Sequence, residues 1–256
     1  MGSIRRSVAL LLVDERGRKH LVPVGGPVVA IRDLGTFDAE KLRTHVGRRL
    51  TLGGRSFWVL RASGRDLEET LGREAQVLSP KDIASILFEA DVGPGSSVVE
   101  SGSGSGGLTL ALARAVGSTG HVVSCDLREE AIAVARGNVE RAGLAAVVEF
   151  RLADFRKGIP EREADAVLID LPDPWSAVAA AWDALRPCGH LATFSPNMEQ
   201  VKETVAAIRK RPFIDVRTIE LIEREMEVRD VGVRPSFAPL GHTGYLTFAR
   251  KVLDTF

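Results

Sequence analysis

Four carboxylates follow short apolar stretches in the later part of the chain, at Glu100, Asp126, Asp154 and Asp170. A glycine-rich turn over residues 102–107 comes directly after the first stretch. Its glycines match the spacing G-x-G-x-x-G, which lets a ligand approach the backbone closely because no Cβ stands in the way. This spacing is shared by proteins that bind NAD, FAD or S-adenosylmethionine. No Gly-Lys-Ser/Thr run follows, so a P-loop is excluded.

The acids favour one of these ligands. Glu100 directly precedes the turn, where a carboxylate would repel a pyrophosphate but can help position the cationic amino and sulfonium groups of S-adenosylmethionine. Asp126 lies 22 positions beyond Gly104, where an acid can accept hydrogen bonds from both ribose hydroxyls; this suits NAD equally well. Asp154 is placed to accept from the adenine amino group while the Phe155 backbone N–H faces the ring. Each acid alone could be a strand-end or cap residue, but together they predict a site for S-adenosylmethionine.

Asp170 is the candidate catalytic residue. It ends the apolar run DAVLID and is followed by LPDPW, Leu171–Trp175. A strand-end acid followed by proline and an aromatic residue recurs in enzymes that methylate amino or ring nitrogens of bases. The prolines fix the backbone, so that the carboxylate can point into a pocket. The alternative is that Asp170 caps the next helix, although Asp173 lies nearer to the start of that helix.

The segments around these acids alternate between strand and helix, which predicts a doubly wound parallel sheet. The carboxyl ends of such strands open onto a shared ligand crevice, so the acids are expected at one edge. Two long strands joined by an irregular loop are expected to close the chain. The expected strands are 97–101, 121–126, 147–151, 165–170 and 190–195, and the expected helices are 80–90, 106–116, 129–143, 175–185 and 196–211. We therefore predict an α/β fold of the class I methyltransferase type, with a Rossmann-like seven-stranded sheet; the chain has no room for a dehydrogenase's substrate domain.

The first quarter of the chain differs in charge and in pattern. Residues 1–65 hold 13 Lys+Arg and 5 Asp+Glu, a balance of +8, which leaves −8 for residues 66–256 of a chain with no net charge. Short apolar runs separated by tight turns predict a small β-domain there, in front of a catalytic domain over 66–256. The charge indicates an anionic partner, with nucleic acid the usual one, unless the basic surface is merely solvated.

Composition limits the other possibilities. No stretch approaches the roughly 18 to 20 apolar residues of a membrane helix, and the N-terminus lacks the pattern of a signal peptide. Cys125 and Cys188 form no C-x-x-C pair, which argues against a disulfide scaffold and a zinc site and favours a reducing cytoplasm. The five histidines form no cluster, so no metal is expected.

Five segments carry a family resemblance: QVLSPKD, VVESGSGSGGLTLALARAVG, LIDLPDPW, FSPNMEQV and RP…GHTGYLTFARK. In this order and spacing they resemble the tRNA (adenine-58-N1) methyltransferases over nearly the whole chain, including the small N-terminal β-domain. The resemblance implies transfer of a methyl group from S-adenosylmethionine to N1 of adenine 58, with adenine 57 left open, in the T-loop of tRNA. It also implies a homotetramer, as in bacteria and archaea, or a pair of catalytic and non-catalytic subunits, as in eukaryotes.

The resemblance also assigns residues. The cofactor-binding set it implies is Leu78, Glu100, Gly102, Ser103, Gly104, Ser105, Gly106, Asp126, Leu127, Asp154, Phe155 and Asp170. The substrate-binding set is Phe194, Gln200, Arg234 and His242. His242 is expected to be a hydrogen-bonding residue of the last turn rather than a catalyst, and Phe194 either stacks on the target base or belongs to the core.

The chain departs from the family at four positions. Phe194 stands where many prokaryotic members have Tyr, Ser79 where a ring is common, Asp126 where Glu is commoner, and Met226 where Trp is frequent. These changes concern base stacking and the choice of neighbouring adenines; none of them concerns Asp170.

The expected mechanism needs no strong base, because adenine N1 is a neutral lone pair. Ionised Asp170 can accept a hydrogen bond from the exocyclic amino group and stabilise the positive charge that develops on the ring. Two other functions remain open. A non-catalytic tRNA-binding subunit would lose the glycine turn and Asp170, and a methyltransferase for proteins or small molecules would not need the basic β-domain.

Overall fold

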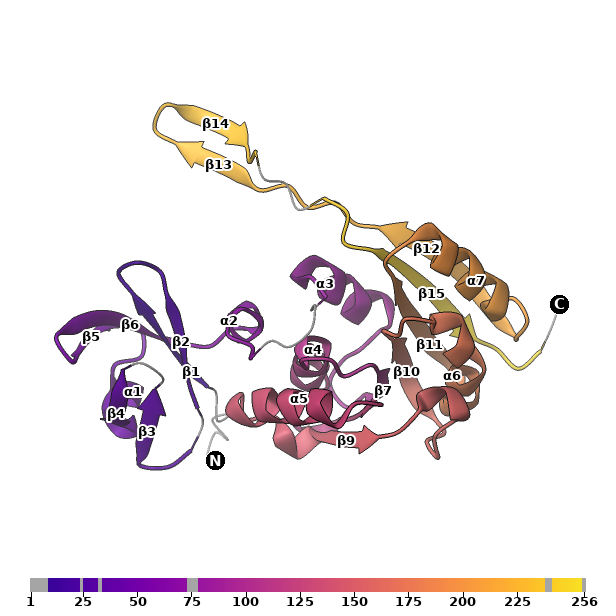
Figure 1. The fold of residues 1–256 in the computed structure, drawn as a ribbon, viewed down its shortest axis with the longest axis horizontal. Helices are drawn as coiled ribbons and strands as arrows, with labels where there is room; N and C mark the ends of the chain where they lie inside the picture. Colours follow the sequence, from indigo (N-terminus) through magenta and orange to yellow (C-terminus); the bar gives the residue numbers. More distant parts are fainter. Residues whose placement is uncertain (1–8, 24, 32–33, 73–77, 238–240, 255–256) are drawn as a thin grey trace.

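The computed structural model describes residues 9–23, 25–31, 34–72, 78–237 and 241–254, and it places a small β-domain beside a larger α/β domain (Figure 1). The two domains are joined through α2, Gly64–Glu69. Ser63 begins this helix with a capping box: its side chain accepts from the Asp66 N–H, and the Asp66 side chain accepts from the Ser63 N–H.

The small domain is built from short antiparallel strands. Four of them form a sheet in the order β2-β1-β6-β5, and β3 pairs with β4. Alternation along β6 explains its two faces: Phe57 and Val59 are buried in the domain core, while Trp58 and Leu60 are exposed. The elements are β1 Leu10–Asp14, β2 Lys19–Val22, β3 Val28–Ile31, β4 Gly35–Asp38, α1 Ala39–Thr44, β5 Arg49–Leu52 and β6 Arg55–Arg61. The predicted β-domain is therefore present.

The large domain is the predicted seven-stranded sheet, in the order β12-β15-β11-β10-β7-β8-β9. The strands from β11 to β9 are parallel, and β15 runs antiparallel to both of its neighbours. The strands are β7 Ser97–Ser101, β8 His121–Asp126, β9 Val148–Leu152, β10 Ala164–Ile169, β11 Leu185–Ser195, β12 Phe213–Glu220 and β15 Tyr245–Lys251. The order reverses between β7 and β10, which makes this the switch point where such sheets bind ligands.

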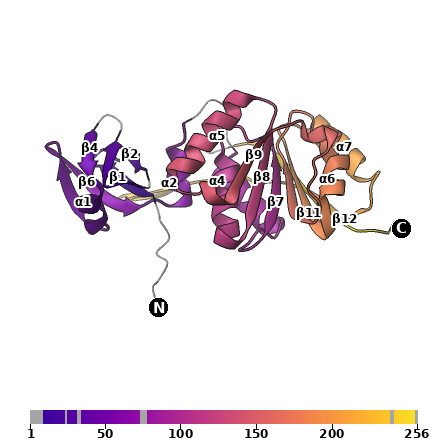
Figure 2. The same ribbon diagram turned by 90° about the horizontal axis from the view of Figure 1, so that it is seen from below.

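Helices cover both faces of this sheet (Figure 2). One face packs against α3 and α4, and the other against α6 and α7. The helix at Pro80 begins as predicted, with the Ser79 side chain accepting from the Asp82 N–H. The α-helices are α3 Pro80–Glu89, α4 Gly107–Val116, α5 Glu129–Arg141, α6 Val178–Ala184 and α7 Met198–Ile208, and the 3₁₀ turns are η1 Gly117–Thr119, η2 Ala145–Val147, η3 Phe155–Lys157 and η4 Pro174–Ala177.

The expectation of two long closing strands is only partly right. The first strand ends at Glu220, and the following residues form a separate hairpin, β13 Met226–Arg229 and β14 Gly232–Pro235, that projects from the body (Figure 1). Arg229 pairs with Gly232 across a two-residue turn, so these strands pair with each other instead of extending β12. The hairpin exposes apolar side chains, namely Met226, Val228, Val231 and Val233.

A buried apolar cluster joins the two domains. The β-domain and the segment after it contribute Ala9, Leu11 and Ala62, and the α/β domain contributes residues of α4, of α5 and of the turn that follows α5. The members from α2 onward are Leu67, Leu110, Val139 and Ala142. Because these side chains are withdrawn from water by the contact itself, the β-domain is packed onto the catalytic domain.

Candidate functional site

The glycine turn joins β7 to α4, and its glycines are needed for different reasons. A Cβ on Gly102, at φ +99°, would lie 2.0 Å from the Asp170 carbonyl oxygen. A Cβ on Gly106 would lie 3.0 Å from Cα of Ala135 on α5. Only Gly104, at φ +50°, faces open space within 4 Å. Ligand approach therefore explains Gly104, whereas the flanking glycines allow the strand end and the helix to pack against the turn.

Glu100 lies under this turn and is fully buried. Its Oε2 accepts hydrogen bonds from the hydroxyls of Thr109 and Ser124, both at 2.5 Å, while its Oε1 is buried with no partner among the described residues. Burial raises the pKa of Glu100 to about 8, and the charges of Asp170 and Asp126 add to the effect. A buried polar atom without a partner is costly, and a cationic group beside Oε1 would favour the ionised form of Glu100 and give this oxygen a donor.

Asp126 is held at the end of β8 and is nearly buried. Its carboxylate accepts from the Gly104 N–H at 3.1 Å and from the Arg128 N–H at 3.0 Å. The Gly104 contact ties the acid to the open glycine of the turn. The Arg128 side chain also donates to both oxygens, at 3.3 and 3.4 Å, so each oxygen already accepts two hydrogen bonds. Ribose hydroxyls would take the place of this exposed arginine side chain.

Asp154 lies at the next strand end, where its carboxylate forms a two-point contact with Arg156. Arg156 also reaches Asp173 with its Nη1, 3.1 Å from Oδ2, and so links the expected adenine end of the site to the LPDPW segment. These arginine contacts lower the pKa of Asp154. Arg156 was not among the predicted site residues; its position two residues after a strand-end acid was the available signal.

Asp170 stands at the end of β10, next to the turn. Its N–H donates to the Ser101 carbonyl at 2.8 Å, and its own carbonyl lies against Gly102. Burial raises the pKa of Asp170 to about 6, assisted by the nearby charge of Asp126. The structure thus brings Glu100, Asp126 and Asp170 to one sheet edge, as predicted.

The segment after Asp170 is anchored from α7. The Gln200 side-chain amide donates to the Pro172 carbonyl at 3.0 Å, and its Oε1 is buried without a partner among the described residues. Asn197 caps α7 by accepting from the Gln200 N–H at 2.9 Å. Gln200 therefore positions the LPDPW segment, in addition to its expected role toward the substrate.

Phe194 lies near the end of β11, half-buried against the core cluster under α3 and α4. A Cβ on Gly244 would be 2.3 Å from its ring, so the ring lies directly on the chain before β15. Phe194 is therefore partly packed and partly exposed. Its stacking on the target base stays a prediction.

His242 is held by two acceptors. Its Nδ1 is 2.7 Å from Glu220 Oε1, and its Nε2 is 2.9 Å from the Pro196 carbonyl. Both nitrogens can donate only in the protonated ring, and these contacts raise the pKa of His242. This supports the expectation of a hydrogen-bonding residue of the last turn.

Arg234 lies away from the other predicted residues, on β14 of the projecting hairpin. Its guanidinium pairs with Glu227 at 2.6 Å and lies over the Phe237 ring at 3.9 Å. Within this chain the structure does not bring Arg234 to the sheet edge. A substrate contact by Arg234 would therefore require a second molecule to bind at the hairpin.

A buried cluster that the sequence analysis did not identify ties the two ends of the catalytic domain together. Asp82, which is fully buried, accepts from the hydroxyls of Ser79 and Thr243, each at 2.7 Å, and pairs with Lys81 at 2.9 Å. These residues belong to the SPKD and HTGY motifs. This cluster holds the two motifs against each other, although they lie far apart in the sequence.

The remaining predicted cofactor residues lie around the same turn. Ser103 Oγ is 2.6 Å from Ser124 Oγ, and Ser105 accepts from the Asn138 side chain through its carbonyl at 2.8 Å. Leu78 is buried at the start of α3, and the Phe155 ring is buried in the core. Leu127 is 54% exposed beside Asp126, where it could cover a ligand.

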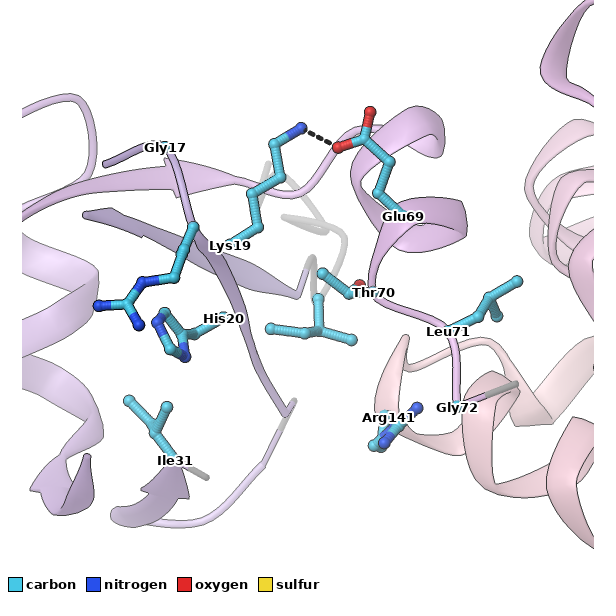
Figure 3. Close-up of a pocket in the computed structure, with 11 residues that line it drawn as sticks. Gly17, Lys19, His20, Ile31, Glu69, Thr70, Leu71, Gly72 and Arg141 are labelled. Atoms are coloured by element: carbon cyan, nitrogen blue, oxygen red, sulfur yellow. Dashed lines mark hydrogen bonds and ion pairs between the residues drawn. The ribbon is translucent and has the colours of Figure 1, made fainter. Parts of the chain in front are cut away.

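A hollow of about 680 Å³ lies elsewhere, at the junction of the two domains (Figure 3). Lys19 and Glu69 face each other across its upper side, and His20 and Arg141 lie below them. None of the strand-end acids lines it. Lys19 and Glu69 pair with each other across the domain junction, whereas Arg18 pairs with Asp14 and Arg141 with Asn138 within their own domains. Because the hollow lacks the strand-end acids, we place the chemistry at the sheet edge instead.

The described part of the chain contains no group of three or more His, Cys, Asp or Glu residues arranged to hold a metal ion. None of the helices in these ranges has the length and apolar character needed to cross a membrane.

Comparison with known proteins gives consistent matches. Residues 58–236 match the family model described as tRNA methyltransferase complex GCD14 subunit. The chain is 37% identical, over 94% of each protein, to the tRNA (adenine(57)-N(1)/adenine(58)-N(1))-methyltransferase TrmI of Methanocaldococcus jannaschii. It is also 37% identical to the tRNA (adenine(58)-N(1))-methyltransferase TrmI of Thermus thermophilus, over 94% of this chain and 96% of the relative.

A solved structure confirms the fold. The crystal structure of a SAM-dependent O-methyltransferase from Thermotoga maritima is similar with a TM-score of 0.82 and 30% identity, over 99% of this chain and 96% of that one. The predicted class I methyltransferase fold, with a small β-domain in front, is therefore correct.

Proposed function

The chain belongs to the tRNA methyltransferase family whose model it matches, and on this basis we propose that it methylates N1 of adenine 58 in the T-loop of tRNA. The methyl donor is S-adenosylmethionine. Adenine 57 is a second target to test, because the relative from Methanocaldococcus jannaschii is named for both positions.

The residues present fit the donor. The unpartnered Oε1 of Glu100 offers an acceptor to its cationic part, and the open side of Gly104, next to the Asp126 carboxylate, leaves room for its ribose. Asp154, Phe155, Leu78 and Leu127 are proposed to hold the adenine. When bound, S-adenosylmethionine supplies an electrophilic methyl group.

Asp170 is proposed to act on the target base. In its ionised form it accepts a hydrogen bond from the exocyclic amino group of adenine, which raises electron density at N1 and stabilises the cationic product. The backbone contacts of Asp170 to Ser101 and Gly102 hold the carboxylate beside the glycine turn. Gln200 holds the following segment through Pro172, and Phe194 offers a ring to the extruded base.

We further propose a role for the small domain and for assembly. Residues 1–65, with their charge of +8, grip tRNA phosphates, and residues 66–256 carry the chemistry. The exposed apolar side chains of the projecting hairpin support association into a homotetramer, which would also bring Arg234 to a neighbouring subunit. We also propose a cytoplasmic location, because tRNA is the proposed substrate. Light scattering of the purified protein tests the tetramer.

The observation that carries the proposed function is the convergence of Glu100, Asp126 and Asp170 on one sheet edge beside an open glycine. The test is incubation with labelled S-adenosylmethionine and an unmodified tRNA transcript, followed by mapping of the methylated nucleoside. We expect 1-methyladenosine at position 58. Label at another nucleoside, or none in tRNA, would contradict the proposal.

One observation favours a second candidate, a methyltransferase acting on a small molecule or a protein. The similar structure from Thermotoga maritima is described as an O-methyltransferase. The same assay separates the two, because an O-methyltransferase leaves the transcript unlabelled. A non-catalytic subunit is disfavoured by the intact glycine turn and Asp170.

A further inference from the structure

One face of the small β-sheet carries an exposed tryptophan that no core contact explains. Trp58 lies in the middle of β6 and is 44% exposed, although its neighbours Phe57 and Val59 are fully packed. Tryptophan usually buries most of its large apolar surface. An exposed indole at the centre of a sheet therefore marks a surface that could bind a planar partner.

A cation lies over this ring. Arg49 is paired with Trp58 across β5 and β6, and its guanidinium carbon is 4.8 Å from the ring centroid. The arginine is itself exposed, so the guanidinium and the indole beneath it form a layer that is open to solvent. Layers of indole and guanidinium are surfaces on which unpaired bases stack.

The layer borders a hollow of about 440 Å³, which we call the Trp58 hollow; Asp14, Glu15, Arg49 and Trp58 are among the residues that line it. Its wall is well defined, because the Asp14 carboxylate accepts from the Arg16 and Arg18 N–H groups, each at 2.9 Å. Asp14 also binds the Arg55 side chain at 3.0 Å, which fixes the turn after β1 onto β6.

The acid that faces the hollow suits a base. Glu15 lines the hollow and can accept from the amino edge of a base, whereas the Asp14 carboxylate is already bound by the Arg18 and Arg55 side chains. The surrounding domain is strongly basic, at +8 over residues 1–65, which suits the phosphates on either side of such a base.

We propose that the Trp58 hollow binds an unpaired base of the RNA substrate, stacked on the layer of Trp58 and Arg49. This proposal rests on the proposed function, because it takes RNA to be the substrate. It assigns the β-domain a contact with a base, beyond its general attraction for phosphates. The site is separate from the pocket for the target adenine, which lies at the sheet edge of the other domain.

The test compares the full-length protein with Trp58→Ala and Trp58→Phe in binding to an unmodified tRNA transcript. Loss of one stacked base is expected to raise Kd roughly 5- to 100-fold in Trp58→Ala. Trp58→Phe should recover most of the affinity, because phenylalanine keeps an aromatic face. Phe88→Ala is the matched control, since it removes an exposed ring from α3 outside the hollow.

Salt dependence separates stacking from charge. Trp58→Ala should weaken binding at every salt concentration with an unchanged slope of log K against log salt, whereas Arg48→Gln, which removes a neighbouring exposed charge, should reduce the slope by about 0.7–0.9. Binding of tRNA should also quench a part of the tryptophan fluorescence that Trp58→Phe lacks. At saturating tRNA the single-turnover methylation rate should not change.

The outcomes distinguish this proposal from the proposed function. If the unmutated protein methylates tRNA but Trp58→Ala binds it equally well, the stacking site is wrong and the function stands. If Trp58→Ala weakens tRNA binding but the unmutated protein transfers no methyl group to tRNA, the function is wrong and the site stands. A change in the mass of the assembly in Trp58→Ala would overturn the site in favour of a contact with a second copy.

Discussion

Asp170 combines a strand-end position with an environment that controls its charge. We expect Asp170→Asn to lower the rate of methyl transfer by roughly 10²–10³, because the amide keeps the shape and an acceptor oxygen but loses the negative charge that stabilises the cationic product. The affinity for S-adenosylmethionine should be nearly unchanged. Single-turnover methylation at saturating cofactor and tRNA measures the step without a contribution from binding.

The pH profile of methyl transfer is the control for the Asp170→Asn experiment. Because the pKa of Asp170 is raised to about 6, the rate should rise about tenfold per pH unit below pH 6 and level off above it. The Asp170→Asn variant should lack this rise. An Asp170→Asn variant that methylates at the unmutated rate would make Asp170 a structural residue.

Glu100 should couple the stability of the cofactor-free protein to pH. Its pKa in the folded protein, about 8, lies above the ordinary value of 4.5, so the folded state binds this proton more tightly. The resulting stabilisation is complete below about pH 4.5 and is lost as the pH rises through 8. We expect the free energy of unfolding of the unmutated protein, relative to Glu100→Gln, to fall by on the order of a few kcal/mol between pH 5 and pH 9.

Urea unfolding of both proteins across this range, without cofactor, measures the difference. The Glu100→Gln variant cannot ionise at this position, so the titrations of groups that do not interact with Glu100 cancel in the comparison. A difference that stays constant from pH 5 to pH 9 would show that Glu100 is ionised in the folded protein despite its burial.

At the level of elements, the turn between β7 and α4 depends on two glycines in different ways. Gly102→Ala places a Cβ 2.0 Å from the Asp170 carbonyl, so the end of β10 must move. We expect a loss of about 2–5 kcal/mol in stability, from overpacking and positive-φ strain together, and a large loss of activity. Gly104→Ala meets open space and should cost only about 1–2 kcal/mol, from its backbone conformation.

Thermal unfolding and cofactor titration of the two variants distinguish these effects. Gly104→Ala should weaken binding of S-adenosylmethionine more than it weakens the fold, and Gly102→Ala should do the reverse. Equal effects of the two substitutions on stability would mean that the contact between the turn and β10 is looser than the structure shows.

At the level of the whole molecule, the basic domain and the catalytic domain share a buried contact. Deletion of residues 1–65 would uncover Leu110 of α4 and Val139 of α5, so it would remove stability together with RNA binding. Substitution of exposed charges is the cleaner way to test the role of this domain.

We expect the combined Arg16→Gln, Arg48→Gln and Arg61→Gln substitutions to reduce the slope of log K against log salt for tRNA by about 2–3, with cofactor affinity unchanged. The matched control replaces Arg209, Lys210 and Arg211, which follow α7 at the far end of the molecule (Figure 1). Filter binding over a range of salt concentrations measures both. Equal reductions from the two triple variants would mean that the β-domain is not the main contact with RNA.

The sequence by itself determined the strands from β7 to β11, the helices between them, and the edge at which Glu100, Asp126 and Asp170 meet. These follow from local rules: apolar runs bounded by turn residues form buried strands, and parallel strands joined by helices bring their carboxyl ends together. The glycine spacing, together with the acids at the strand ends, then favoured S-adenosylmethionine as the ligand. The motifs SPKD and HTGY were visible, but their connection through Asp82 was not.

Only the tertiary structure decided the contacts between residues far apart in the chain. The approach of Asp170 to Gly102, the anchoring of Pro172 by Gln200 and the pairing of Arg156 with Asp173 depend on packing across strands and helices. The projecting hairpin was missed because residues 226–235 pair with each other, and a pattern of alternation does not reveal which strand is the partner. The exposure of Trp58 and the charge states of Glu100 and Asp170 depend likewise on what surrounds each side chain, which spacing along the chain does not specify.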